Sequence, residues 1–343
     1  MKRTLHYTLV LLMAAGLAAC ATPQVASTAT PATNAADSEP DTPQQAGKLP
    51  AYRRVDKLQG VIQLSGSSAV ATFARAWGSA FTRIYPNASV NVVSKSSAAA
   101  VGDMAANPAT VGMMSRAMNP AERAQYVKQH GQPPLEFKVA IDAVAIYVFK
   151  NNPLPSISLA QLERIFAATP KAGAAIERWG QIGLTGDWAA RTVTGIGFEA
   201  GRGAYDLMRE LVLRGGNFNA DVSAEPVSTS VVQAVGVEPG AIGYASVYYH
   251  TARTRMLPLQ TANGELAQPT DADASSGKYP LARYLYLYLG VPKGGDADAA
   301  AREFLRFVLS EEGQHAARTS GAFAITPELA RSQRAVLGRW NRQ

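Results

Sequence analysis

The sequence predicts an α/β protein with two lobes, on three observations. Short runs rich in valine, isoleucine and aromatic residues alternate with segments whose apolar residues recur at helical spacing. The chain has 343 residues, enough for two ordinary domains. Hydrophobic residues make up 47% of it and charged residues 17%, so most of the chain can bury a core and wholesale disorder is excluded.

The expected elements follow one another as strand and helix. We expect strands at 61–64, 90–93, 110–114, 138–149, 192–198, 241–244 and 284–291, and helices near 70–84, 97–104, 204–214, 299–309 and 327–337. Ser158 and Gln161 fit a capping box before a further helix. This alternation favours mainly parallel sheets, with a ligand in the cleft beyond the carboxyl ends of the strands.

The division into lobes follows from the two longest strand runs. The runs at 138–149 and near 241–247 are the candidate crossings between lobes. We therefore expect lobe 1 to comprise residues 60–143 and 248–343, and lobe 2 residues 144–247. The crossings would then form a hinge of two segments.

The first 20 residues read as an export signal. Two basic residues, Lys2 and Arg3, precede a short apolar stretch that ends in small residues before Cys20. The alternative is an ordinary cleavage site followed by an incidental cysteine. The sequence from Leu17 to Cys20 resembles a bacterial lipobox, which implies a signal peptide over 1–19 and lipidation of Cys20. Acyl chains would hold the protein at a membrane.

Residues 20–59 are expected to be a disordered linker. They are rich in alanine, threonine, proline, glutamine and serine and show no periodicity. Such a segment cannot bury enough apolar surface to offset its ordering entropy.

Two strand-to-helix junctions carry hydroxyl groups. Ser67 and Ser68 follow the strand at 61–64, and Ser97 follows the strand at 90–93, each just before a helix. Helix starts offer free N–H groups to anions, and Gly66 permits close approach. Plain N-capping explains each junction equally well. Two such helix starts can converge on one anion.

Three further polar residues lie at or in strands. Ser115 and Arg116 end the strand at 110–114, where an arginine can bind an oxyanion with two parallel hydrogen bonds. An ion pair within the protein is the simpler alternative for Arg116. Asp142 sits inside an apolar strand, where a carboxylate needs a partner. It either caps neighbouring backbone or accepts a ligand proton.

A glycine-rich stretch at 195–203 leads into the helix at 204–214. Its third glycine is one residue too late for a dinucleotide-binding turn. A helix start with Arg202 and Gly203 is again suited to an anion. The chain has one cysteine and four scattered histidines, so we expect no metal site, no cofactor and no disulfide framework.

Several of these segments, in this order, resemble the phosphate-binding proteins of ABC importers. The matching pieces lie between about residues 58 and 329 and include Gly66–Val70, Ser96–Val101, Met114–Arg116, Asp142–Ile146, Leu159–Phe166 and Pro239–Tyr244. The resemblance implies a hinged, two-lobed type II periplasmic-binding-protein fold. It implies that phosphate is held by N–H groups, hydroxyls and a guanidinium.

The resemblance implies roles for the residues at matching positions. Ser67, Ser68 and Ser97 would donate hydrogen bonds to phosphate, Arg116 would be its charge partner, and Asp142 would accept a phosphate proton. The sequence departs from the family at the second-lobe helix start, where Ser-Gly-Thr is replaced by Arg202, Gly203 and Ala204. The family's arginine four residues earlier is Phe198 here. Arg202 can restore that charge from a new place.

The expected function is an extracytoplasmic, lipid-anchored binder of inorganic phosphate or a similar tetrahedral oxyanion, for ABC-type uptake or sensing. Its expected partners are that anion, an ABC permease and a membrane. Ala21 after the cysteine indicates the outer rather than the inner membrane. The alternative is an envelope protein-interaction module that reuses the fold. A phosphoesterase lacks any recognisable nucleophile–base pair, and spread positive charge argues against nucleic acid.

Overall fold

The computed structural model describes residues 47–339, apart from residues 201, 250 and 293. The described residues belong to one compact unit. The expected export signal, Cys20 and the expected linker up to residue 46 lie outside the described residues. Among the residues that are described, no helix is both long and apolar enough to cross a membrane.

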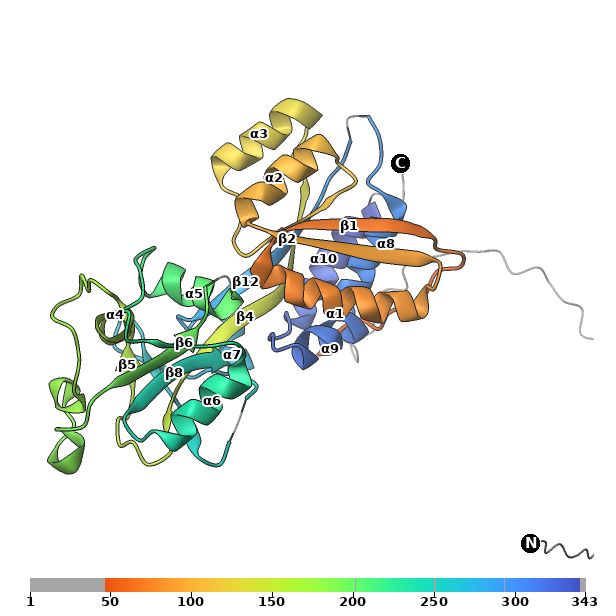
Figure 1. Ribbon diagram of the computed structural model, residues 1–343. Coiled ribbons are helices and arrows are strands. Elements are labelled where there is room, and N and C mark those ends of the chain that lie inside the picture. The colour runs from red at the N-terminus through yellow and green to blue at the C-terminus, as the bar shows by residue number, and fades with distance from the viewer. Residues whose placement is uncertain (1–46, 201, 250, 293, 340–343) are drawn as a thin grey trace, which may run out of the picture. The chain divides into compact units, whose positions relative to one another are not determined.

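A nine-stranded sheet organises the described chain, in the order β2-β1-β3-β12-β4-β8-β6-β7, with β9 also paired to β4 (Figure 1). Its first part contains β1 (Gly60–Ser67), β2 (Ala88–Lys95), β3 (Val111–Met114), β12 (Ala282–Leu289) and the first half of β4 (Leu135–Phe149). Strand β1 is parallel to β2 and β3, whereas β12 is antiparallel to β3 and β4. Its helices are α1 (Ser68–Ile84), α2 (Ser97–Ala106), α3 (Pro120–His130), α8 (Ala299–Val308), α9 (Glu311–Thr319) and α10 (Pro327–Arg339).

The second part is built on the other half of β4. That half pairs antiparallel with β8 (Ala241–Ser246) and β9 (Thr254–Leu257), and β8 continues in parallel to β6 (Thr194–Phe198) and then β7 (Ser223–Glu225). A small sheet contains β11 (Leu266–Ala267), β10 (Leu259–Gln260) and β5 (Ile157–Ser158). The helices are α4 (Leu159–Phe166), α5 (Gly203–Leu211), α6 (Ser228–Val237) and α7 (Asp271–Ser275), with short 3₁₀ turns at Trp179–Ile182 and Gly186–Trp188.

Each part has its own hydrophobic core, which we use to define lobe 1 and lobe 2. The core of lobe 1 includes Trp77, Phe81 and Phe304, and that of lobe 2 includes Trp179 and Tyr244. All of these side chains are fully buried. Burial of one large aromatic side chain contributes about 2–3 kcal/mol, so each core is substantial.

The predicted α/β pattern is confirmed in its elements. Every expected strand is present within a few residues, and so are the expected helices. The capping box at the start of α4 is confirmed: the N–H of Gln161 donates to Ser158 Oγ at 3.2 Å, and that of Ser158 to Gln161 Oε1 at 2.9 Å. Helix α9 was not expected, because its sequence is polar and only one face is buried.

The second crossing between the lobes lies elsewhere than expected. Strand β8 stays within lobe 2, and the chain returns to lobe 1 at β12, which pairs with the first half of β4. Buried residues after 247, such as Leu257, Leu259 and Tyr279, belong to the core of lobe 2 because β9 pairs with the second half of β4. This segment had been expected in lobe 1.

Residues 48–55 pack on lobe 1, although they fall in the stretch expected to be a disordered linker; we call them the strap. The Tyr52 hydroxyl donates to Glu303 Oε1 and contacts the Tyr85 hydroxyl, both at 2.7 Å. Its ring meets Phe307 edge-to-face, with centroids 5.3 Å apart. The strap backbone bonds to α9 and α10 as well, for example from Glu311 N–H to the Pro50 carbonyl at 2.9 Å. Tyr52 and Leu49 pack on the lobe 1 core, and together with the backbone bonds they hold the strap in place.

Replacing Tyr52 with phenylalanine should lower the free energy of unfolding by about 1–3 kcal/mol. The ring stays in place, but Glu303, which is only 3% exposed, loses one of its donors. Urea unfolding of residues 42–343 measures the loss. Tyr249→Phe, at a half-exposed tyrosine, is the matched control and should change stability by less than about 0.5 kcal/mol. Equal stability of the two variants would contradict a fixed strap.

Candidate functional site

The start of α1 is free of side-chain capping. Ser67 ends β1 and is 5% exposed, but its side chain makes no capping hydrogen bond to the helix. The neighbouring Ser68 Oγ donates instead to Asp206 Oδ2 on α5, at 3.4 Å. Plain N-capping therefore does not explain Ser67, and the first-turn N–H groups of α1 keep their capacity for an anion.

The glycine before these serines serves strand packing. Gly66 has φ +137°, and a Cβ there would overlap the carbonyl oxygen of Met113 and lie 2.8 Å from Ala100 Cβ. The interpretation that Gly66 makes room for an anion is therefore wrong on this side of the backbone. The room is filled by β3 and α2, which lie against β1.

Ser97 and Ser115 are brought together, although β1 lies between the strands β2 and β3 that they follow. The Ser115 N–H donates to Ser97 Oγ at 3.1 Å, and the two hydroxyl oxygens are 3.3 Å apart. The start of α2 is capped by Ser96, whose Oγ accepts from the Ala99 N–H at 3.2 Å. The Ser97 hydroxyl is thus not needed as a cap.

Arg116 is already paired within the protein. Its Nη1 and Nη2 donate to the two carboxylate oxygens of Glu122, at 2.8 and 2.7 Å. This bidentate pair raises the pKa of Arg116 and lowers that of Glu122. The simpler alternative, an ion pair within the protein, describes Arg116 here.

Asp142 has a partner that was not expected. It stands directly opposite Arg283 in the β4–β12 ladder, and Arg283 Nη2 and Nε lie 3.3 and 3.4 Å from its Oδ2. The two side chains are 13% and 9% exposed. Burial raises the pKa of Asp142, and the charge of Arg283 opposes that rise. Arg283 Nη1 also donates to Glu210 Oε2 on α5, at 2.8 Å.

The second-lobe helix start carries Gly203 to the site but leaves Arg202 at the surface. A Cβ on Gly203 would lie 3.3 Å from Ala69 Cα, so the starts of α5 and α1 are adjacent. Arg202 caps nothing with its side chain, is about half exposed and pairs with Glu199 at 3.7 Å. Phe198 is buried against Tyr244. The expected replacement of the family's charge by Arg202 gains no support from this geometry.

These contacts form one cluster, which we call the interlobe cluster. It joins Ser68 and Asp142 from lobe 1, Asp206 and Glu210 from lobe 2, and Arg283 on the strand that links them. Burial raises the pKa of Asp206, and Arg283 opposes the rise. Charge from Glu210 also acts on Arg116. Two uncapped helix starts, hydroxyls and a fork-shaped cation are the groups that bind a tetrahedral oxyanion.

Sequence reasoning missed Arg283, Asp206 and Glu210. A signal for Arg283 was present: it is a lone positive charge in an apolar strand, as Asp142 is a lone negative one. Asp206 and Glu210 are spaced by four residues and so share a face of α5. Nothing in the local sequence tells which lobe that face contacts.

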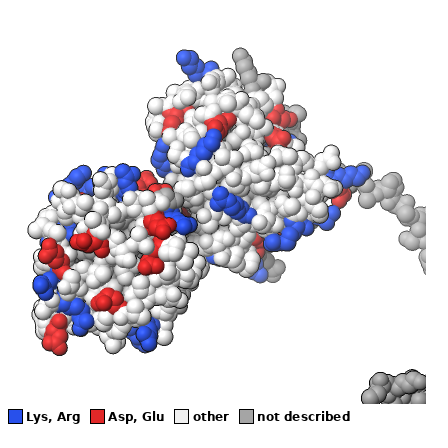
Figure 2. All heavy atoms as spheres, viewed as in Figure 1, with Lys and Arg blue, Asp and Glu red and all other residues white. Residues whose placement is uncertain are grey.

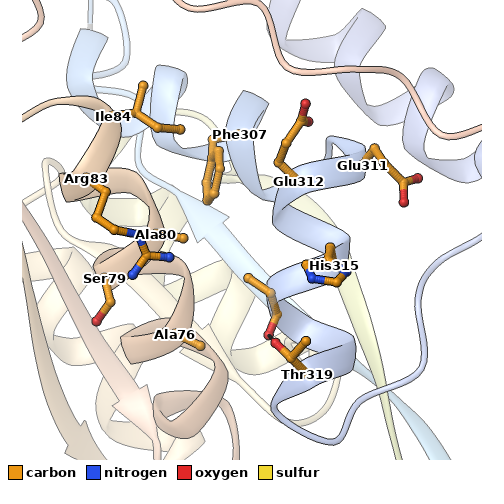
Figure 3. Close-up of a pocket in the computed structure, with 11 residues that line it drawn as sticks. Ala76, Ser79, Ala80, Arg83, Ile84, Phe307, Glu311, Glu312, His315 and Thr319 are labelled. Atoms are coloured by element: carbon orange, nitrogen blue, oxygen red, sulfur yellow. Dashed lines mark hydrogen bonds between the residues drawn. The ribbon is translucent and has the colours of Figure 1, made fainter.

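The two described surface grooves lie away from this cluster. One, of about 800 Å³, runs between α1 and α9 and is lined by Arg83 from α1 and His315 from α9 (Figure 3). The other, of about 860 Å³, runs between α1 and β2. None of the predicted site residues lines either groove. Within the described ranges, no group of three or more His, Cys, Asp or Glu could hold a metal ion.

Comparison with known proteins decides the family. The model of the PBP superfamily domain matches residues 22–312. The phosphate-binding protein PstS of Pseudomonas aeruginosa is 32% identical over 293 residues, which is 84% of this chain and 91% of that protein. The chain belongs to the PstS family of the PBP superfamily. Its PstS relative in Staphylococcus epidermidis is 24% identical over 80% of this chain and 82% of its own length.

Solved structures agree on the fold of this PstS-family chain. A possible phosphate-binding protein from Planctomyces limnophilus has a TM-score of 0.70 at 23% identity, covering 82% of this chain and all but 1% of its own. An ABC-type phosphate transport receptor from Vibrio cholerae has a TM-score of 0.61 at 20% identity, covering 76% and 99%. The predicted two-lobed type II fold is confirmed, and so is the prediction that the family consists of binding proteins rather than enzymes.

Proposed function

We propose that this chain captures inorganic phosphate, or a similar tetrahedral oxyanion, at the interlobe cluster and delivers it for ABC-type uptake or sensing. The observation that carries the proposal is the adjacency of two helix starts, α1 and α5, neither with a side-chain cap. Helix starts carry a partial positive charge and unpaired N–H groups, which suit a phosphate oxygen. The relatives named phosphate-binding proteins support the same ligand.

Each predicted site residue has a role in this proposal. Ser67, Ser68, Ser97 and Ser115 would donate hydroxyl hydrogen bonds, and Gly203 would bring backbone N–H groups close. Arg283 would supply the main positive charge. When the anion binds, the hydrogen bond between Arg283 and Glu210 would break. Arg116 would attract the anion through its charge while it stays paired with Glu122. Asp142 and Asp206 would accept a phosphate proton, and Arg202 would contribute only long-range charge.

The cellular setting is also part of the proposal. The signal-like sequence at 1–19 and Cys20 support a lipid-anchored protein in the periplasm, and Ala21 supports the outer membrane over the inner. The division into lobes is proposed as lobe 1 around β1–β3 and lobe 2 around β6–β9, with an ABC permease as the partner. Lipidation is tested by mass spectrometry of the purified protein and of a Cys20→Ala variant.

Calorimetric titration of residues 42–343 with phosphate, arsenate and sulfate tests the ligand. The Ser68→Ala/Ser97→Ala variant should bind phosphate at least tenfold more weakly, since each hydrogen bond to a charged group contributes about 1.5–3 kcal/mol. Ser89→Ala/Ser94→Ala, at two exposed serines of β2, is the matched control and should bind as the parent does. Neither heat nor a thermal shift with any of these anions at millimolar concentration would remove the proposal.

One observation favours the alternative function, an interaction module without tight anion binding. Arg116 and Arg283 are both already paired with carboxylates, and Asp206 lies beside Ser68. An arriving anion must compete with these groups. The titration decides between the two functions, because the interaction module predicts no response to any oxyanion.

A further inference from the structure

The edge of the sheet at β2 is open. Among the described residues, β2 pairs only with β1 and stands at the end of the strand order. It therefore presents a row of unpaired backbone N–H and C=O groups along one side. Such an edge is a template on which a further strand can pair.

This edge lacks the usual devices that block pairing. All eight residues of β2 pair with β1 in unbroken register, without a bulge, and the strand contains no proline. Its one charged residue, Lys95, stands at the far end and is held by Asp103 at 2.7 Å. Natural edge strands are usually shortened, bulged or charged to prevent pairing. The regular geometry here leaves the edge able to accept a partner strand.

A groove lies alongside the open edge. It has a volume of about 860 Å³ and runs between β2, at Val90 to Val93, and the outer face of α1. The α1 side carries small residues, Gly78, Ser79 and Thr82. Gly78 packs so tightly on Val90 that an added Cβ would lie 3.0 Å from Val90 Cβ. A strand bound in this groove would pair with β2 on one side and would contact the small and aliphatic residues that line the groove.

The charged side chains that line the groove are all positive. Arg75 and Arg83 are its charged residues; both are exposed, and Arg83 lines the α1–α9 groove as well. No acidic residue lines the groove. Figure 2 shows Lys and Arg side chains over α1, separated by uncharged surface. No ion pair with either arginine is formed by the described residues that line the groove.

We propose that the groove between α1 and the edge of β2 binds an extended acidic peptide segment of a partner protein, which adds to the sheet as a strand beside β2. Backbone hydrogen bonds to β2 would supply affinity, as in strand addition generally. Alternate side chains of the peptide would lie over Ser79 and Thr82, where small groups fit. Its carboxylates would meet Arg75 and Arg83.

The charges disfavour a second copy of this chain as the occupant. Pairing of two β2 edges would bring Arg75 and Arg83 of one copy toward the same residues of the other, and like charges repel. The site is also separate from the interlobe cluster, since no residue of the groove belongs to it. A test of peptide binding at this groove is therefore independent of whether the interlobe cluster binds phosphate.

The experiment measures binding of a fluorescein-labelled peptide, Glu-Val-Glu-Val-Ser-Val-Glu, to the full chain in detergent by fluorescence anisotropy. We expect saturable binding with a micromolar Kd that is unchanged by phosphate. Arg75→Glu/Arg83→Glu should weaken it about tenfold or more. Lys150→Glu/Arg253→Glu, at two exposed basic residues of lobe 2, is the matched control and should bind as the parent does. Hydrogen exchange should slow at the β2 amides when the peptide is bound.

Several results would overturn the proposal. One is no saturable binding; another is equal binding of the same peptide with lysine in place of glutamate. Unchanged β2 exchange on binding would contradict strand addition. Binding by residues 42–343 but not by the full chain would make the chain's own N-terminal segment the occupant. If the Arg75→Glu/Arg83→Glu variant still binds the peptide but no longer binds anionic vesicles, the surface would be assigned to a membrane. If that variant still binds the peptide but no longer forms a dimer, the surface would be assigned to a second copy of this chain.

Discussion

Replacing Arg283 with alanine should lower the free energy of unfolding by about 3–5 kcal/mol at neutral pH. The change leaves Asp142 with 13% of its side chain exposed and without the cation that faces it across the β4–β12 ladder. An uncompensated buried carboxylate is costly because its hydration is not replaced. Urea unfolding of residues 42–343 measures the loss, and phosphate titration should show weaker binding in the same variant.

The loss in Arg283→Ala should depend on pH. Burial already raises the pKa of Asp142 above its ordinary value, and removal of Arg283 removes the charge that opposes this rise. A carboxyl whose pKa is higher in the folded state binds more protons there than in the unfolded chain. Stability of the variant should therefore recover as pH falls from 7 toward 4, and the gap from the parent should narrow.

A double variant separates the lost charge pair from lost packing. Arg283→Gln/Asp142→Asn removes both charges and keeps polar side chains at both positions, so most of the stability should return. If the double variant is as unstable as Arg283→Ala, and the gap does not change with pH, then the ion pair is not the cause. Packing of the long arginine side chain would then account for the loss.

Replacing Gly66 with alanine should destabilise the chain by at least about 3 kcal/mol, or prevent folding. The backbone there has φ +137°, which L side chains rarely adopt, and the new Cβ would overlap the Met113 carbonyl. Strained backbone and overpacking each cost about 1–3 kcal/mol. Because β1 ends one residue later at Ser67, the variant should also lose phosphate binding at temperatures where it remains folded.

The chain offers a matched control for Gly66→Ala on the neighbouring helix. Gly102 lies on α2, is exposed and would have nothing within 4 Å of an added Cβ. Gly102→Ala should leave stability unchanged or raise it by about 1 kcal/mol, since alanine is the better helix former. Thermal and urea unfolding of both variants are the measurements. Similar stability of the two would show that β1 can move away from β3 without loss.

The elements of this fold were predictable because their local signals are strong. The helix α1 has apolar residues at regular spacing, including Phe73, Trp77 and Phe81, and the strand β4 is a long apolar run. Helix α9 was missed because the residues it buries are Gly313, Gln314 and Ala317, which carry little hydrophobic signal. Its position depends on contacts with α1, and sequence periodicity does not contain such contacts.

The site was predictable only in part. Strand ends identified Ser68, Ser97 and Asp142, because polar residues after or inside apolar strands are visible in the sequence. The partner of Asp142 was not, since Arg283 is 141 positions away and is placed opposite it by the register of an antiparallel ladder. Arg202 stays a prediction: its local context suits an anion, and in the structure its guanidinium lies 3.7 Å from Glu199 at the surface.

The strap has a mechanical consequence for the proposed lipid anchor at Cys20. A pull on the N-terminal end of the strap would reach Lys48, Pro50 and Tyr52 before it reaches β1. These residues are hydrogen-bonded to α10, α9 and the end of α1. If Cys20 is lipidated as proposed, the strap would carry a pull from the membrane before that pull reaches β1, whose last residue is Ser67.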